Sequence, residues 1–155
     1  MTNDQAGPPA SGRFESGTHL LPVRVYYEDT DFTGAVYHAN YLRFMERGRS
    51  ESLRSIGIDH VSLAQRPAPL AFAVRNINVT FLRPARIDDA LVVRTSYSEV
   101  AGARIIARQE ILRGGELLAE ADVEIACISR EGRPRRLPHD IVEALRQSHG
   151  DKRQP

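Results

Sequence analysis

An acidic turn at residues 28–38 contains the side chains best suited to chemistry in this chain. Asp29 and Asp31 supply carboxylates, Gly34 permits a sharp reversal of the backbone, and His38 follows. A carboxylate such as that of Asp31 is ionised at neutral pH, because its ordinary pKa is about 3.9. It can attack a carbonyl carbon directly, or it can activate a water molecule for the attack. The turn therefore holds either a nucleophile or a general base.

The elements on either side of the turn decide what that carboxylate can reach. Residues 22–27 are rich in β-branched and aromatic types, which predicts a strand. Residues 40–56 have apolar positions at helical spacing, with Asn40 as the expected N-cap and Gly57 as the expected C-cap. A helix N-terminus offers N–H groups without intrahelical acceptors and a partial positive charge. The order strand, turn, helix thus predicts a carboxylate beside a site that can stabilise an oxyanion.

The rest of the chain predicts a sheet around that helix. Strands are expected at residues 70–82, 90–100, 103–112 and 116–129, after a loop with a helical turn at 59–69. Their short connections, two of which are glycine turns, predict antiparallel pairing. A short helix is expected at 138–147. The fold class is therefore α+β, with one domain at residues 21–147 between flexible tails at 1–20 and 148–155.

Composition excludes several classes of function. The 155 residues are 41% hydrophobic and 26% charged with a net charge of +1, which is no electrostatic footprint for nucleic acid. No apolar run is long enough to span a bilayer, and the N-terminal residues lack the pattern of a signal peptide. The single cysteine, Cys127, lies in an apolar run and is expected to pack in the core. A cytoplasmic location is expected.

Two sequence strings carry a resemblance to a known family. Residues 23–31 read VRVYYEDTD, and Gly34, Val36-Tyr37-His38 and Asn40-Tyr41 follow in register. This pattern resembles the 4-hydroxybenzoyl-CoA thioesterase family, whose hotdog fold wraps a sheet around one long helix. Within that family it is most similar to the acyl-CoA thioesterases associated with the Tol–Pal system. Weaker similarity at residues 72–75, 83–89 and 135–138 extends the match over nearly the whole chain outside the tails.

The resemblance implies an activity and a set of roles. Acyl-CoA would be hydrolysed to free acid and CoA without a metal, and with no cofactor apart from the CoA of the substrate. Asp31 would be the catalytic carboxylate, and the backbone N–H of His38 would polarise the thioester carbonyl. The chain would form a homodimer or a dimer of dimers, that is a homotetramer, with active sites at the subunit interface. Association with cell-envelope or lipid-synthesis proteins is also implied.

Substrate contacts are expected from the helix and from the strand after it. The predicted set is Tyr37, Tyr41, Phe44, Met45 and Phe72. Many relatives have a basic residue in the turn before the third long strand, but here that turn reads Val100-Ala101-Gly102. Arg104, which follows it, is the expected substitute for contacts with the CoA phosphates. The arginines at 133, 135 and 136 are interpreted as a solvated loop, ahead of a site for a phosphate-bearing ligand.

Each candidate residue also has a simpler interpretation. Asp31 could be an ordinary turn aspartate, although the resemblance favours catalysis. The His38 side chain is equally consistent with capping the helix and with orienting Asp31 or contacting substrate. Asp29 is expected to accept backbone N–H bonds within the turn. Glu46 is expected to pair with Arg43 or Arg47, with a catalytic role as the alternative, since other hotdog enzymes use a helix glutamate. Asp29, Asp31 and His38 lack the spacing of a recognised metal site.

Two other functions fit the same pattern. A hotdog hydratase or dehydratase pairs a histidine with a carboxylate, which His38 and Asp31 could imitate. A non-catalytic acyl-thioester-binding protein, or an interaction partner of cell-envelope proteins, would need no reactive carboxylate. Release of free thiol separates the thioesterase from the hydratase or dehydratase, and the Asp31→Asn substitution tests the non-catalytic alternative.

Overall fold

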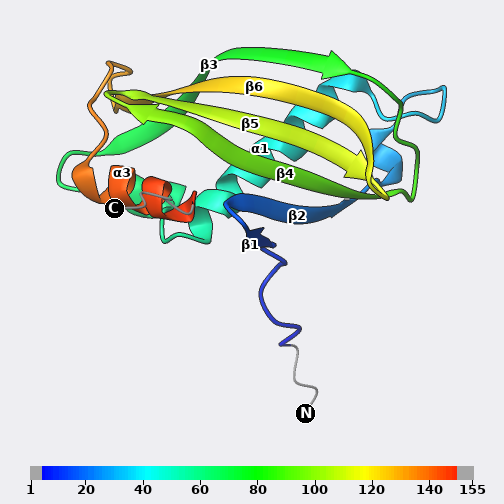
Figure 1. The fold of residues 1–155 in the computed structure, drawn as a ribbon, viewed down its shortest axis with the longest axis horizontal. Coiled ribbons are helices and arrows are strands. Elements are labelled where there is room, and N and C mark those ends of the chain that lie inside the picture. Colours follow the sequence, from blue (N-terminus) through cyan, green and yellow to red (C-terminus); the bar gives the residue numbers. More distant parts are fainter. Residues whose placement is uncertain (1–4, 150–155) are drawn as a thin grey trace.

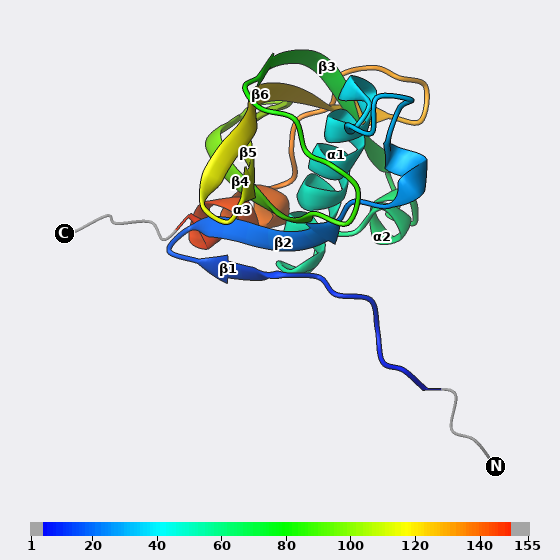
Figure 2. The ribbon, with the colours of Figure 1, turned by 90° about the vertical axis from the view of Figure 1, so that its right-hand side faces the viewer.

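A curved antiparallel sheet wraps one long helix in the computed structural model, which describes residues 5–149. Figure 1 shows the sheet in front of helix α1, and Figure 2 shows it curling around that helix. The elements are β1 Arg13–Glu15, β2 Thr18–Arg24, the 3-10 helix η1 Tyr27–Asp29, α1 His38–Arg54, α2 His60–Ala64, β3 Leu70–Phe81, β4 Ala90–Ala101, β5 Arg104–Arg113, β6 Glu116–Ser129 and α3 His139–Ser148.

The order of the strands brings distant segments together. It is β1-β2-β4-β5-β6-β3, and all neighbouring pairs are antiparallel. The glycine turns predicted this correctly for β4 with β5 and for β5 with β6, but β3 and β4 do not pair with each other, although a short segment connects them. The strand that follows the helix, β3, pairs with β6 through Phe81↔Ala119 at its end and forms one edge of the sheet. The other edge of β3 pairs with no strand among the described residues.

Helix α1 packs against the concave side of the sheet. Tyr41, Phe44, Met45 and Leu53 are buried on one stripe, which confirms the helical periodicity. At Gly48 the helix approaches the sheet so closely that a Cβ atom would lie 2.7 Å from Val93 Cγ1. The absence of a side chain there lets the two layers meet.

The strands bury one face and expose charge on the other. Residues of β5 alternate, with Ile105, Ala107 and Ile111 buried in the core. Across the outer face Arg108 pairs with Glu120 at 2.7 Å. Cys127 of β6 is fully buried, which confirms the expectation of a core thiol.

The N-terminal strand differs from its prediction. The expected strand at 22–27 is shifted to β2 at Thr18–Arg24, and Tyr26 and Tyr27 are exposed beyond its end. The expected tail at 1–20 is corrected as well, because Ser16 and Gly17 have positive φ values of 50° and 81° and connect β1 and β2 as a tight hairpin. Residues 1–4 lie outside the described part of the chain. Helix α3 continues to Ser148, and residues 150–155 of the second predicted tail also lie outside the described range.

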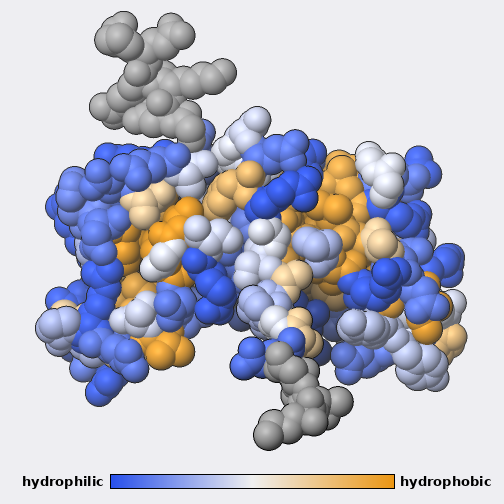
Figure 3. All heavy atoms as spheres, turned by 90° about the horizontal axis from the view of Figure 1, so that it is seen from below, coloured by the Kyte–Doolittle hydropathy of each residue, from blue (hydrophilic) through white to orange (hydrophobic). Residues whose placement is uncertain are grey.

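Polar and apolar side chains are mixed on the surface. Seen from below, most of the face is hydrophilic, and apolar side chains show in two separate areas, one toward each end of the molecule (Figure 3). Within residues 5–149, the structure contains no helix with the length and apolar character that crossing a membrane requires.

Candidate active site at the start of the long helix

The acidic turn is held against the helix by main-chain and side-chain hydrogen bonds of Asp29. Its carboxylate accepts from the backbone N–H of Tyr26 at 2.8 Å. Its carbonyl oxygen accepts from the N–H of Tyr37 at 2.9 Å and from the side-chain amide of Asn40 at 2.8 Å. Asp29 is buried, and these contacts confirm that it organises the turn.

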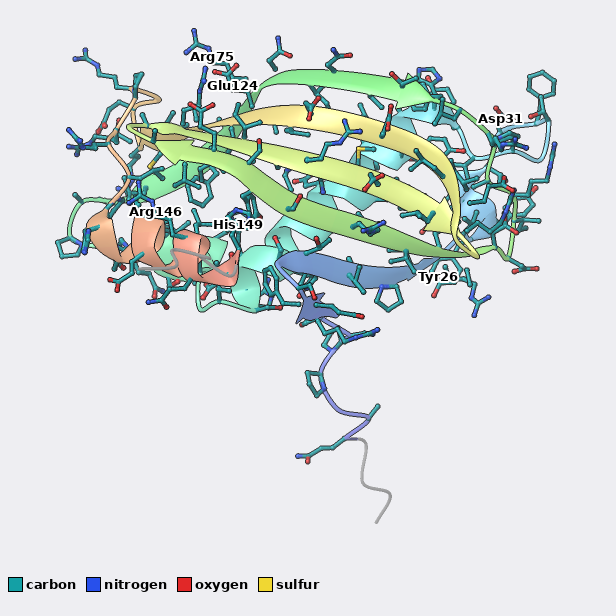
Figure 4. The ribbon with its side chains drawn as sticks, viewed as in Figure 1. Tyr26, Asp31, Arg75, Glu124, Arg146 and His149 are labelled. Carbon is teal, nitrogen blue, oxygen red and sulfur yellow. The ribbon has the colours of Figure 1, made fainter. Side chains whose placement is uncertain are left out.

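Asp31 lies at the outer side of that turn. Its carboxylate accepts hydrogen bonds from the backbone N–H of Thr33 at 2.8 Å and from the Thr33 hydroxyl. These two bonds, the hydroxyl first, lower the pKa of Asp31 because they favour the charged form. In the single chain Asp31 is partly exposed, and it lies at the opposite end of the molecule from Arg146 and His149 of the α3 region (Figure 4). Asp31 is therefore an ionised, accessible carboxylate.

The chain returns from Asp31 to the helix within a few residues. The N–H of Asp31 donates to the carbonyl of Ala35 at 2.9 Å, and the intervening Gly34 has a φ of +82°. Helix α1 begins at His38 with Tyr37 as its N-cap, two residues before the predicted start, and the cap has no side-chain hydrogen bond. The N–H groups of His38 and Ala39 are the first of the helix, so they have no intrahelical acceptor. The sequence predicted both the short connection from Asp31 to the helix and the N–H groups without intrahelical acceptors at the helix start.

A shallow cavity of about 280 Å³ adjoins the helix start. Val36, His38 and Tyr41 line it on one side, and Phe81, Leu82 and Pro84 line it on the other. The His38 ring is exposed and packs against Tyr37 at 4.5 Å and Phe81 at 6.1 Å between ring centroids. The cavity therefore joins the end of β3 to the first turn of α1, and we call it the helix-start cavity.

A second cavity of about 200 Å³ lies farther along the same helix. The apolar part of its wall consists of Leu53, Phe72, Val74, Ile105 and Ile125, and polar side chains such as Ser50 and His60 form the rest. Glu46 and Arg49 of α1 also line it, and the Arg49 guanidinium donates to the Gln109 side chain at 2.9 Å. Burial lowers the pKa of Arg49. We call this space the β3 cavity, because the start of β3 forms one of its walls.

The predicted substrate-contacting residues fall into different places. Tyr37 is half-exposed at the turn, the Tyr41 ring lines the helix-start cavity, and Phe72 lines the β3 cavity. Phe44 and Met45 are fully buried and line neither cavity, because they face the sheet. Both belong to the hydrophobic core of the single chain, and their contact with substrate stays a prediction.

Arg104 lies away from the turn, on the outer face of the sheet. Its guanidinium donates to both oxygens of Glu99 at 3.0 Å and lies 3.7 Å from Glu124. A CoA phosphate would have to compete with these two carboxylates. The structure thus gives Arg104 a role in surface ion pairs that the sequence did not reveal, because Glu124 is on a strand distant in sequence.

Two residues of the site were missed from the sequence. Thr33 holds the Asp31 carboxylate, and an Asp followed two residues later by Thr is a recognisable signal for such a turn. Phe81 packs beside His38 and Tyr41. Nothing in the local sequence signals that contact, since it depends on β3 crossing to the edge of the sheet. Within residues 5–149 no three His, Cys, Asp or Glu side chains gather as a metal site would require.

A curved antiparallel sheet around one long helix, with an acidic turn at the helix start, defines a hotdog-fold protein. The chain belongs to the Thioesterase-like superfamily, which matches residues 25–145. Both the predicted fold class and the resemblance to hotdog thioesterases are thereby confirmed.

Several relatives in sequence and in structure are named as thioesterases or thioester hydrolases. The chain is 41% identical over 126 residues to the acyl-CoA thioesterase YbgC of Haemophilus influenzae, covering 81% of this chain and 92% of that one. It is 42% identical over 129 residues to the acyl-CoA thioester hydrolase YbgC of Escherichia coli O6:H1, covering 81% and 94%.

A similar structure is the probable thioesterase from Bartonella henselae, with a TM-score of 0.76 and 50% identity over 78% of this chain and 99% of that one. A thioesterase from Thermus thermophilus, solved with coenzyme A and zinc, has a TM-score of 0.71 at 26% identity, covering 86% and 95%.

Proposed function

We propose that this protein is an acyl-CoA thioesterase that hydrolyses the thioester bond to a free acid and CoA. The observation that carries the proposal is the short connection from Asp31 to the first turn of α1. Relatives that cover four-fifths of the chain are named as acyl-CoA thioesterases, which supports the same substrate class.

The chemistry needs an attacking oxygen and a place for the developing oxyanion. The Asp31 carboxylate attacks the thioester carbon as a nucleophile, or it takes a proton from an attacking water as a general base. The backbone N–H of His38 stabilises the carbonyl oxygen as it gains charge, and loss of one such donor typically costs about 10²–10³ in rate. The carbon–sulfur bond then breaks, and the thiolate leaves as CoA and takes up a proton. In the general-base route this releases the free acid directly. In the nucleophilic route it leaves an anhydride between the acyl group and Asp31, which a water molecule hydrolyses to the free acid and the regenerated carboxylate.

The free edge of β3 supports a dimer. This strand of 12 residues has one partner, β6, and an unpaired second edge within the described residues. Antiparallel pairing of two such edges about a two-fold axis would satisfy their N–H and C=O groups and join two sheets. It would also bring the Phe81 end of β3 in one protomer to the Phe72 end in its partner.

That pairing supports a position for the acyl group. The helix-start cavity lies at the Phe81 end of β3, and the β3 cavity contains Phe72 and Val74 from its beginning. In the dimer each helix-start cavity would face the β3 cavity of the partner. A thioester bound beside Asp31 would then place its acyl tail among the apolar side chains of the second protomer.

Acyl-CoA as substrate agrees with the expected cytoplasmic location. Assembly into a tetramer and association with cell-envelope or lipid-synthesis proteins remain predictions. Size-exclusion chromatography with light scattering measures the oligomer, and replacement of the half-exposed Val74 with Glu should weaken the dimer by introducing charge at the edge strand.

The decisive experiment measures thiol release from short, long and aromatic acyl-CoAs by the wild type and by Asp31→Asn. We expect turnover by the wild type and near-complete loss in the variant with unchanged thermal unfolding. Hydration or dehydration of the acyl chain without free thiol would establish the hydratase alternative instead. Thiol release that survives Asp31→Asn would remove Asp31 from the mechanism.

A further inference from the structure

We propose that Tyr41 is a positioning residue whose hydroxyl sets the distance between the acidic turn, which carries Asp31, and the start of α1. The inference rests on the proposed catalytic role of Asp31. It concerns the segment at residues 83–89, which connects β3 to β4 and which the mechanism above does not use. Because this segment touches both the helix and the turn, it can transmit the position of one to the other.

The hydroxyl of Tyr41 reaches the segment directly. It accepts a hydrogen bond from the backbone N–H of Ala85 at 2.8 Å. Tyr41 is 4% exposed and Ala85 is fully buried, so the bond between them is largely shielded from bulk water. The Tyr41 ring is itself fixed between Phe44 and Phe81, with centroids at 6.4 and 5.5 Å. The packed Tyr41 side chain of α1 therefore fixes the position of the Ala85 peptide in the segment.

Ala85 and its neighbour Arg86 also hold the acidic turn in place. The carbonyl of Ala85 accepts from the N–H of Val36 at 2.9 Å, and Ala35 and Arg86 form an antiparallel bridge. The carbonyl of Ala35 in turn accepts from the N–H of Asp31 at 2.9 Å. A continuous path of hydrogen bonds therefore runs from the Tyr41 hydroxyl through Ala85 and residues 35–36 to the backbone of Asp31.

The segment is anchored elsewhere without Tyr41. Arg113 of β5 donates to the carbonyl of Pro84 at 3.2 Å and to the carboxylate of Asp89 at 2.7 Å. The main chain of Asp89 accepts from Val25 at 2.9 Å. Because these contacts keep the segment folded, removal of the Tyr41 hydroxyl should shift the turn relative to the helix while the fold persists.

The test compares two hydroxyl deletions on the same helix. Tyr41→Phe removes the bond to Ala85, and Ser52→Ala removes a buried bond between Ser52 and Tyr97 that lies away from the turn. Both variants should unfold at somewhat lower temperature than the wild type. Only Tyr41→Phe should lower kcat for acyl-CoA hydrolysis, by roughly ten- to a hundredfold, with KM within about twofold, because misplacement of about 1 Å can cost that much.

Hydrogen exchange supplies a readout independent of activity. Tyr41→Phe should speed amide exchange in peptides covering residues 29–37 and 83–89, and Ser52→Ala should leave both unchanged. Wild-type kcat in Tyr41→Phe, or an equal loss of kcat in Ser52→Ala, would overturn the inference. If Asp31→Asn were inactive while Tyr41→Phe retained full kcat, only this inference would fail. If Asp31→Asn kept its activity, the proposed catalytic role of Asp31, on which this inference rests, would fail, and absence of thiol release by the wild type would refute the proposed function itself.

Discussion

The side chain of Asn40 donates a hydrogen bond to the main-chain oxygen of Asp29 at 2.8 Å, and this bond ties the first turn of α1 to the acidic turn. Asn40 is buried, so the bond is shielded from water. The residue expected to cap the helix thus fixes the segment that carries the catalytic carboxylate. The helix starts at His38, two residues before the predicted start. Its N-cap, Tyr37, is held by a hydrogen bond from its own N–H to the Asp29 carbonyl oxygen.

Asn40→Ala should therefore impair both folding and catalysis. We expect the free energy of unfolding to fall by about 1 kcal/mol, the usual net value of one hydrogen bond. We also expect kcat to fall, because the turn loses one of its two connections to the helix. Urea denaturation and thiol-release kinetics measure the two effects. A loss of stability with wild-type kcat would show that the turn keeps its position without this bond.

Thr33→Val should move the acid limb of the pH–activity profile. The Thr33 hydroxyl is the main cause of the lowered pKa of Asp31, since it donates to the charged carboxylate. Its removal raises that pKa toward the ordinary value, so kcat/KM should begin to decline at a higher pH than in the wild type. Thr30→Val is the matched control, because the Thr30 hydroxyl donates to the carbonyl of Tyr27 instead. An identical acid limb in Thr33→Val and the wild type would mean that Asp31 does not set it.

The buried His19 and the partly buried His149 predict that the fold weakens in mild acid. His19 is fully buried, and its Nδ1 has no hydrogen-bond partner among residues 5–149. Burial is the main cause of the lowered pKa of both His19 and His149. The carbonyl of Ser11, 2.7 Å from Nε2, raises the pKa of His19, and the nearby Glu51 acts in the same direction, but neither outweighs burial.

The sign of the pH effect follows from these lowered pKa values. Below pH 6.5 the unfolded chain binds protons that the folded chain does not, so the free energy of unfolding should decrease as pH falls toward the folded pKa values. The slope should be at most about 1.4 kcal/mol per pH unit for each histidine. Urea unfolding between pH 5 and 8 measures it, and His19→Gln should reduce the slope. A constant stability over this range would contradict the prediction.

Local sequence signals predicted the parts of the site that depend on neighbours in the chain. The alternation and glycine turns placed β3 to β6 within one or two residues. The polar turn before an amphipathic run predicted Asp31 and His38 as site residues, and their catalytic roles stay predictions. Tyr26 and Tyr27 misled the prediction of β2, because aromatic residues favour strands but here are exposed beyond the strand end. The hairpin at Ser16 and Gly17 was hidden in a stretch whose composition is typical of a tail.

Contacts across the sheet could not be predicted in this way. Ala85 accepts from Val36 and donates to Tyr41 only because β3 crosses to the far edge and its following segment returns to α1. The ion pairs of Arg104 likewise depend on the register of β5 with β6. The first set of contacts joins residues more than forty positions apart, and the second depends on which residues of two strands lie opposite each other. A single sequence carries no local signal for either.

The substitution Val74→Trp should shift the chain-length preference of the enzyme toward shorter acyl groups. Val74 is half-exposed on β3 and lines the β3 cavity, so a larger ring there can narrow the cavity without disturbing the core. If the acyl tail occupies this cavity, kcat/KM for long acyl-CoAs should fall at least about tenfold relative to short ones, since one methylene in an apolar pocket is worth about 1–3 kcal/mol. Val61→Trp provides the control, because Val61 is exposed on α2 and is not part of either cavity. An unchanged chain-length profile in a variant that still dimerises would place the acyl tail elsewhere.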